Sequence, residues 1–113
     1  QMTDLSKAAI DVLAERQRQV EVEGWTPEHD DAHNYGELAS AGACYAFVGS
    51  LTDFQRKVYA YKNPPYLGPM VLHWEWDEKW WKPTTPRRDL VKAAALILAE
   101  IERLDRQEAT RGQ

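Results

Sequence analysis

Four residues that can bind metal ions or carry protons lie within five positions of one polar segment. The segment EHDDAH contains His29, Asp30, Asp31 and His33. Imidazole nitrogens and carboxylate oxygens are suitable ligands for zinc or manganese. The spacing matches neither an HExxH helix nor an EF-hand loop, and the aspartates could instead cap the turn into a following helix. The segment is therefore a candidate ligand-binding loop, and it identifies no metal and no cofactor.

Tryptophan is concentrated in one stretch, because four of the five tryptophans lie in HWEWDEKWWKP. In an extended strand, Trp74 and Trp76 would share one face, opposite His73 and Glu75. One interpretation is a compact core that anchors a loop. The alternative is a surface where rings stack on bases and nearby cations neutralise phosphates. The cations in question are Lys79, Lys82, Arg87 and Arg88. We expect a core in which one or two of these rings stay accessible.

A cation interrupts the apolar side of the first predicted helix. Arg16 projects into the middle of the apolar arc, and Gln19 and Glu23 fall on or near the same face. A buried guanidinium is costly unless a carboxylate, phosphate or carbonyl group satisfies it. We expect either an internal ion pair, with Glu37 or Asp89 as partner, or a polar site beneath this helix. The two interpretations are compatible.

Hydrophobic periodicity predicts the helices that must position these residues. The first runs from Asp4 to about Val22, with Thr3 or Asp4 as N-cap, and ends before Gly24. Its apolar face consists of Leu5, Ala9, Val12, Leu13 and Val20. The second runs from about Gly36 to Val48 and carries small residues that permit close helix packing. The polar segment WTPEHDDAHNY between them is predicted to be a structured loop.

The last helix has the clearest start, because Thr85 is a good N-cap and Pro86 a good first helical residue. One of its faces carries Leu90, Ala93, Ala94, Ile97, Ile101 and Leu104. We expect it to fray after Arg106. The preceding insertion, about 49–84, is rich in tryptophan and proline, with a short helix over 54–61 and an extended segment over 70–76. The prediction is an all-α fold: one domain over 1–113, a compact bundle of three main helices with this insertion between the second and third.

Composition limits the partners. The chain has 113 residues and a net charge of −4, with 14 basic residues scattered among 18 acidic ones. Duplex nucleic acid is disfavoured because its binders carry a concentrated basic face. No apolar run approaches the roughly 18 residues of a membrane helix, and no export leader is apparent, so we expect a cytoplasmic protein without a membrane partner. The single cysteine, Cys44, excludes an internal disulfide and is expected to be a buried, inert thiol.

Three blocks resemble a family of small proteins encoded by phages and prophages. The blocks are ERQRQ at 15–19, EGWTPEHDDAHNYGELA at 23–39 and WWKPTTPRRDLVKAAALILAEIERLDR at 80–106. The resemblance implies an accessory protein that acts in the bacterial host cytoplasm. The blocks overlap most of the residues selected above on physical grounds. The predicted ligand-binding set is Arg16, Gln19, Glu23, Trp25, His29, Asp30, Asp31, His33, Trp80, Trp81 and Arg87.

A second resemblance is to the all-α nucleotide pyrophosphohydrolases of the MazG kind. It implies magnesium held by carboxylates of ExxE and ExxD motifs on adjacent helices. The chain departs from that pattern, because Leu38, Ala39 and Ser40 follow Glu37 without a second acid. The last helix carries Lys92 where the motif requires a carboxylate.

The sequence thus predicts a phage-type protein, without catalytic residues, that binds a nucleotide-like molecule and forms a homo-oligomer. By analogy with small phage-encoded binders, sequestering a nucleotide signal of host defence is the expected role. One alternative is a MazG-like, metal-dependent pyrophosphohydrolase. Another is an interaction module that inhibits a host protein through its tryptophans.

Overall fold

The structure is a computed structural model that describes residues 4–111. Its helices are α1 (Lys7–Glu21), α2 (Pro27–Asp31), α3 (Glu37–Gly49), α4 (Asp53–Val58), the 3-10 helix η2 (Glu78–Trp80) and α5 (Pro86–Arg111). Residues 4–111 contain no strand, and one isolated bridge joins Tyr66 to His73. The predicted all-α fold is confirmed. No helix in the described range is long and apolar enough to span a membrane.

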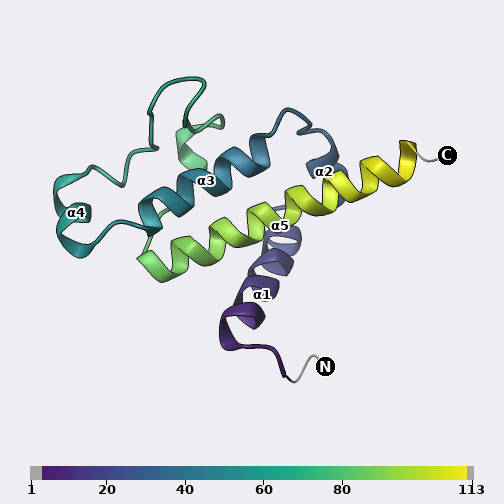
Figure 1. Cartoon of the computed structure of the whole chain (residues 1–113), viewed down its shortest axis with the longest axis horizontal. Coiled ribbons are helices and arrows are strands. Elements are labelled where there is room, and N and C mark those ends of the chain that lie inside the picture. Colours follow the sequence, from purple (N-terminus) through teal and green to yellow (C-terminus); the bar gives the residue numbers. More distant parts are fainter. Residues whose placement is uncertain (1–3, 112–113) are drawn as a thin grey trace.

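Helix α5 is the central element of the molecule (Figure 1). Helix α3 lies antiparallel along it, α1 crosses it, and α2 contacts its second half. The predicted cap is confirmed, since the Arg88 amide donates to Thr85 Oγ1 at 3.2 Å. The predicted fraying after Arg106 is wrong, because the helix continues to Arg111. Arg106 donates to Asp31 of α2 at 2.8 Å, which holds the last turns against the body.

Close packing of α3 on α5 depends on two glycines. A Cβ atom on Gly42 would lie 3.1 Å from the Ala93 carbonyl oxygen, and one on Gly49 would lie 2.8 Å from Leu90 Cγ. The prediction of a close helix contact is therefore confirmed. The core that this contact encloses consists of Leu38, Ala41, Cys44, Tyr45, Val48, Trp81, Ala93, Leu96 and Ala99.

The N-terminal helices start at different places from those predicted. Helix α1 begins at Lys7 because Ser6 caps it, accepting from the Ala9 amide at 3.1 Å. The N-cap prediction for Asp4 is wrong, and Thr3 lies outside the described residues. The segment expected to be a loop contains α2, because Thr26 supplies an N-cap and Pro27 occupies the first helical position.

The predicted apolar faces of α1 and α5 are mostly not the buried ones. Helix α5 buries Val91, Ala93, Ala95, Leu96 and Ala99, of which Ala93 alone belongs to the predicted face. On α1 the buried residues are Glu15, Arg16 and Gln19, while Leu13 is 41% exposed. The contact between α1 and α5 is instead polar, with Arg88 bonded to Glu15 and Arg16 bonded to Glu102. Ion pairing across this contact replaces apolar packing and leaves aliphatic side chains at the surface.

The insertion is tied back to the helices by one buried guanidinium. Arg56 of α4 donates to the Val48 carbonyl at 2.7 Å, the Thr84 carbonyl at 2.9 Å and the Asp89 carboxylate at 3.1 Å. These bonds join the end of α3 to the start of α5. The predicted helix over 54–61 is shorter, and the segment 70–76 forms no strand.

Candidate functional site

A cavity of about 530 Å³ opens where the end of α1, helix α2 and the insertion meet. We call it the tryptophan cavity. Its lining consists of Glu23, Trp25, His29, His33, Glu75, Trp76, Asp77 and Trp80. The Trp25 ring is placed by its backbone, because the Trp25 amide donates to the Gln19 carbonyl at 2.9 Å.

Four aromatic side chains of the cavity form a closed cycle of ring contacts. Trp25 stacks on His29 at 6.2 Å between ring centres, and His29 contacts His33 at 4.5 Å. Trp76 closes the cycle, with its centre 5.6 Å from both His33 and Trp25. Because each ring is held by two others, the aromatic surface is preorganised. Trp80 lies outside this cycle and is 38% exposed.

The two histidines of the cavity each contact a carboxylate through Nδ1. His29 Nδ1 lies 3.2 Å from Asp30 Oδ1, and His33 Nδ1 lies 3.2 Å from Glu37 Oε2. A carboxylate only accepts, so Nδ1 carries the proton in both contacts. Burial raises the pKa of Glu37, but hydrogen bonds from its own amide, the Tyr35 amide and His33 outweigh this effect and lower it, so Glu37 stays charged at neutral pH.

The other polar lining residues are carboxylates. Those of Glu23, Glu75 and Asp77 line the cavity, and none of its lining residues in the described range is a lysine or arginine. The guanidinium of Arg18 donates to Glu23 Oε1 at 3.1 Å, and the Nζ atoms of Lys79 and Lys82 are 5.4 and 5.5 Å from the centre of a Trp80 ring. The cavity therefore combines aromatic surface with hydrogen-bond acceptors and negative charge.

Arg16 lies behind the cavity and holds its walls. It is 8% exposed and donates to Asp30 at 2.8 Å, Glu102 at 3.1 Å and the Trp25 carbonyl at 3.2 Å. The predicted burial and carboxylate pairing are confirmed, but both predicted partners are wrong. Glu37 bonds to the loop before α3, and Asp89 bonds to Arg56.

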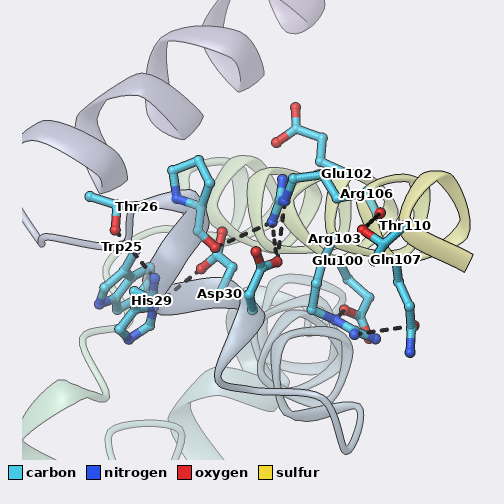
Figure 2. A network of polar contacts seen from close by, with 12 residues as sticks. Trp25, Thr26, His29, Asp30, Glu100, Glu102, Arg103, Arg106, Gln107 and Thr110 are labelled. Atoms are coloured by element: carbon cyan, nitrogen blue, oxygen red, sulfur yellow. Dashed lines mark hydrogen bonds and ion pairs between the residues drawn. The ribbon is translucent and has the colours of Figure 1, made fainter. Parts of the chain in front are cut away.

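This network links α2 to α5. Figure 2 shows Trp25 and His29 at one end of it and the α5 side chains Glu102 and Arg106 toward the other. Asp30 is fully buried and bonds to both His29 and Arg16. The orientation of the cavity's aromatic rings therefore depends on a buried charge pair.

A smaller pocket of about 20 Å³ adjoins the tryptophan cavity. Glu23, Trp25 and Trp80 line both spaces, and Gln19 lines only the inner one. Gln19 Nε2 donates to Glu15, so Oε1 is the atom left to accept. Within residues 4–111 this oxygen is the buried side-chain polar atom that lacks a hydrogen-bond partner. The pocket has room for one water molecule or one ligand N–H group.

The structure brings together part of the predicted set. Glu23, Trp25, His29, His33 and Trp80 line the cavity. Arg16, Gln19 and Asp30 lie directly behind them, as described above.

Three predicted residues lie elsewhere. Asp31 pairs with Arg106 on the surface, and Arg87 pairs with Asp11 at the far end of α5. Trp81 is 6% exposed and belongs to the core, where its ring nitrogen donates to the Tyr61 carbonyl.

Three lining residues were not in the predicted set: Glu75, Trp76 and Asp77. Their signal in the sequence is the alternation of tryptophan with acids in WEWDE. A strand would have turned Glu75 away from Trp76. The chain is irregular there, so both side chains reach the same cavity.

The loop EHDDAH forms no metal centre in the part of the chain that the structure describes. Within residues 4–111, no group of three or more His, Cys, Asp or Glu side chains is close enough to hold a metal ion. The side chains have separate partners instead: Asp30 bonds to Arg16, Asp31 to Arg106 and His33 to Glu37.

Comparison of the chain with protein-family models, curated proteins and solved structures finds no match. The class of protein is therefore defined by fold and site. It is an all-α protein with a preorganised aromatic cavity lined by hydrogen-bond acceptors.

Proposed function

We propose that this protein binds a nucleotide-like small molecule and holds its base in the tryptophan cavity. The observation that carries the proposal is the convergence of Trp25, Trp76 and Trp80 on one cavity of about 530 Å³. A base stacked on an aromatic ring gains roughly 1–3 kcal/mol. The cavity is large enough for a base and its sugar and is open to solvent on one side.

The acceptor lining favours a base with adjacent N–H donors. The carboxylates of Glu23 and Asp77 each accept one internal hydrogen bond, from Arg18 and from the Lys79 amide, and keep lone pairs that can accept two parallel hydrogen bonds from a ligand. Guanine presents such a pair on one edge, from its ring N–H and its amino group. Uracil presents one N–H between two carbonyl oxygens, and these would face the carboxylates unfavourably. The ligand is therefore a guanine-type or other amino-bearing base.

The phosphate groups of such a ligand lie outside the cavity. The carboxylates of Glu23, Glu75 and Asp77 repel an anion, and no cation lines the interior. Lys79 and Lys82 flank Trp80 at the rim, where they attract phosphate. In the proposed complex the base lies inside the cavity and the phosphate charge lies at its entrance.

Sequestration of a host defence nucleotide is the role we propose for such binding. It rests on the resemblance of the three sequence blocks to phage and prophage proteins, and it requires tight binding without turnover. From the same resemblance we infer that the protein acts in the cytoplasm of a bacterial host.

Calorimetric titration without added metal tests the proposal. The panel is guanosine, adenosine, cytidine and uridine with their mono- and cyclic phosphates. We expect guanosine compounds to bind and uridine compounds to bind at least about tenfold more weakly. Trp80→Ala should weaken binding about tenfold or more, because one stacking contact is lost. Phe54→Ala is the matched control, since Phe54 is 71% exposed on α4 and does not line the cavity.

Each of the other possible outcomes contradicts a specific part of the proposal. Metal-dependent release of pyrophosphate from a nucleoside triphosphate would replace the proposal with the hydrolase. Retention of a host protein by the wild-type chain but not by Trp80→Ala would replace it with the interaction module. Equal binding of guanosine and uridine would refute the role of the carboxylates.

A further inference from the structure

A row of aliphatic side chains on α5 is only partly covered by the rest of the chain. Leu90, Ile97, Ile101 and Leu104 are 46%, 42%, 50% and 47% exposed. With Ala94, which is half-buried, they recur at alternating intervals of four and three residues. This is the a/d spacing of helices that pack along one another. We call this row the α5 seam.

The seam belongs to a wider apolar face. Gly42 and Gly49 of α3 lie against Ile97 and Leu90, so the adjoining residues on that side of α3 flank the seam. These are Ala39, Ala43 and Ala46, which are exposed or half-buried. Small side chains there leave room for another helix to approach. Figure 1 shows α3 and α5 side by side across the broad face of the molecule.

The flat shape of the molecule agrees with a second body packing against this face. Its extents are 50 × 38 × 23 Å, and its radius of gyration of 14.9 Å exceeds the value of about 13 Å typical of a domain of this length. A flat body with aliphatic side chains on its broad face buries them by stacking against a second body. A monomeric protein rarely leaves such a row in water.

We propose that the seam binds a second copy of this chain, with the two α5 helices antiparallel. A straight a/d row is self-complementary, which a two-fold symmetric interface requires. Charge sets the direction. On the seam side, Asp105, Glu108 and Arg111 lie toward the end of α5, whereas Arg87 at its start is already paired with Asp11. Antiparallel helices keep Asp105 and Glu108 of the two copies apart and place opposite helix dipoles together, whereas parallel helices place these acids against themselves.

Light scattering coupled to size-exclusion chromatography tests the dimer. The wild-type chain should elute at about twice its mass of 13.0 kDa. Ile101→Glu should elute as a monomer with an unchanged circular dichroism spectrum, because it places a carboxylate in the seam. Val58→Glu is the matched control, since Val58 is 68% exposed on α4, and it should remain dimeric. Leu104→Glu provides a second seam variant if Ile101→Glu unfolds.

Distances between nitroxide labels on Gln107→Cys, an exposed position beside the seam, test the direction. The natural Cys44 is fully buried, and burial raises the pKa of its thiol to about 11, so it should not take the label. If the seams cross at Ile97, antiparallel helices separate the labels by about 30 Å at 1.5 Å per residue. Parallel helices would bring them to about 10 Å and would overturn the antiparallel arrangement.

The dimer itself is overturned by either of two results. If the wild-type chain stays at 13.0 kDa up to about 100 μM, a dimer would have a dissociation constant above that concentration and would be marginal. The seam would then bind a different partner. A folded Ile101→Glu or Leu104→Glu that stays dimeric places the interface elsewhere. Neither result bears on nucleotide binding, which is measured separately at the tryptophan cavity, where no α5 residue lines the site.

Discussion

Replacement of Arg16 by methionine should destabilise the protein by about 3–5 kcal/mol, the cost of removing one partner of a buried ion pair. The value follows from the surroundings of Asp30, which is fully buried and accepts from Arg16 at 2.8 Å. Without the guanidinium, the carboxylate keeps only His29 as a side-chain partner. This loss is large compared with the total free energy of unfolding of a typical protein, which is about 5–15 kcal/mol. Urea unfolding followed by tryptophan fluorescence measures it as a lower midpoint.

A matched control separates burial from pairing. Arg106 also joins α5 to α2, through Asp31 at 2.8 Å, but the two side chains are 34% and 52% exposed. Arg106→Met should therefore cost no more than about 1 kcal/mol. The double variant Arg16→Met with Asp30→Asn should recover part of the loss, because no buried charge is left unpaired. Equal effects of Arg16→Met and Arg106→Met would refute the argument from burial.

Two further predictions concern stability. Hydrogen bonds from Arg18 and Arg88 outweigh desolvation and lower the pKa of Glu15 below its ordinary 4.5. Its contribution to stability is therefore present above about pH 4.5 and lost as the pH falls below it, so Glu15→Gln should show a weaker loss of stability between pH 7 and pH 3 than the wild type. Gly49→Ala should cost about 1–3 kcal/mol, because its Cβ atom would lie 2.8 Å from Leu90 Cγ. An unchanged thermal midpoint would show that Leu90 moves aside freely.

Local signals predicted the helices well and their ends less well. Thr85 and Pro86 marked the start of α5 because an N-cap and a first-turn proline act within one turn of the chain. The same signal, Thr26 followed by Pro27, is present before α2. The segment was nevertheless predicted to be a loop because its composition is polar. At α1 the prediction named Thr3 or Asp4 as the N-cap, whereas the helix is capped by Ser6.

Part of the cavity lining was predicted from the sequence. Trp25, His29 and His33 were found because they lie close together in sequence and in one polar block. Trp80 and Trp81 are neighbours with the same chemistry, yet one lines the cavity and the other is in the core. Adjacent residues point in different directions, and only the packing of the insertion on α3 decides which is buried.

The sequence by itself determined the fold class, the capped C-terminal helix, the close packing of α3 through its small residues and the burial of Arg16 with a carboxylate. These depend on short-range periodicity and on the high cost of an unpaired buried charge. The partner of Arg16, the exposure of the α5 seam and the acidic lining of the cavity were decided by the tertiary structure. Each depends on residues far apart in the chain, such as Arg16 and Glu102, which the pattern of either helix alone cannot pair. The physical reason is that a helical pattern specifies which residues share a face, whereas the neighbour that covers that face is chosen by the packing of the whole chain.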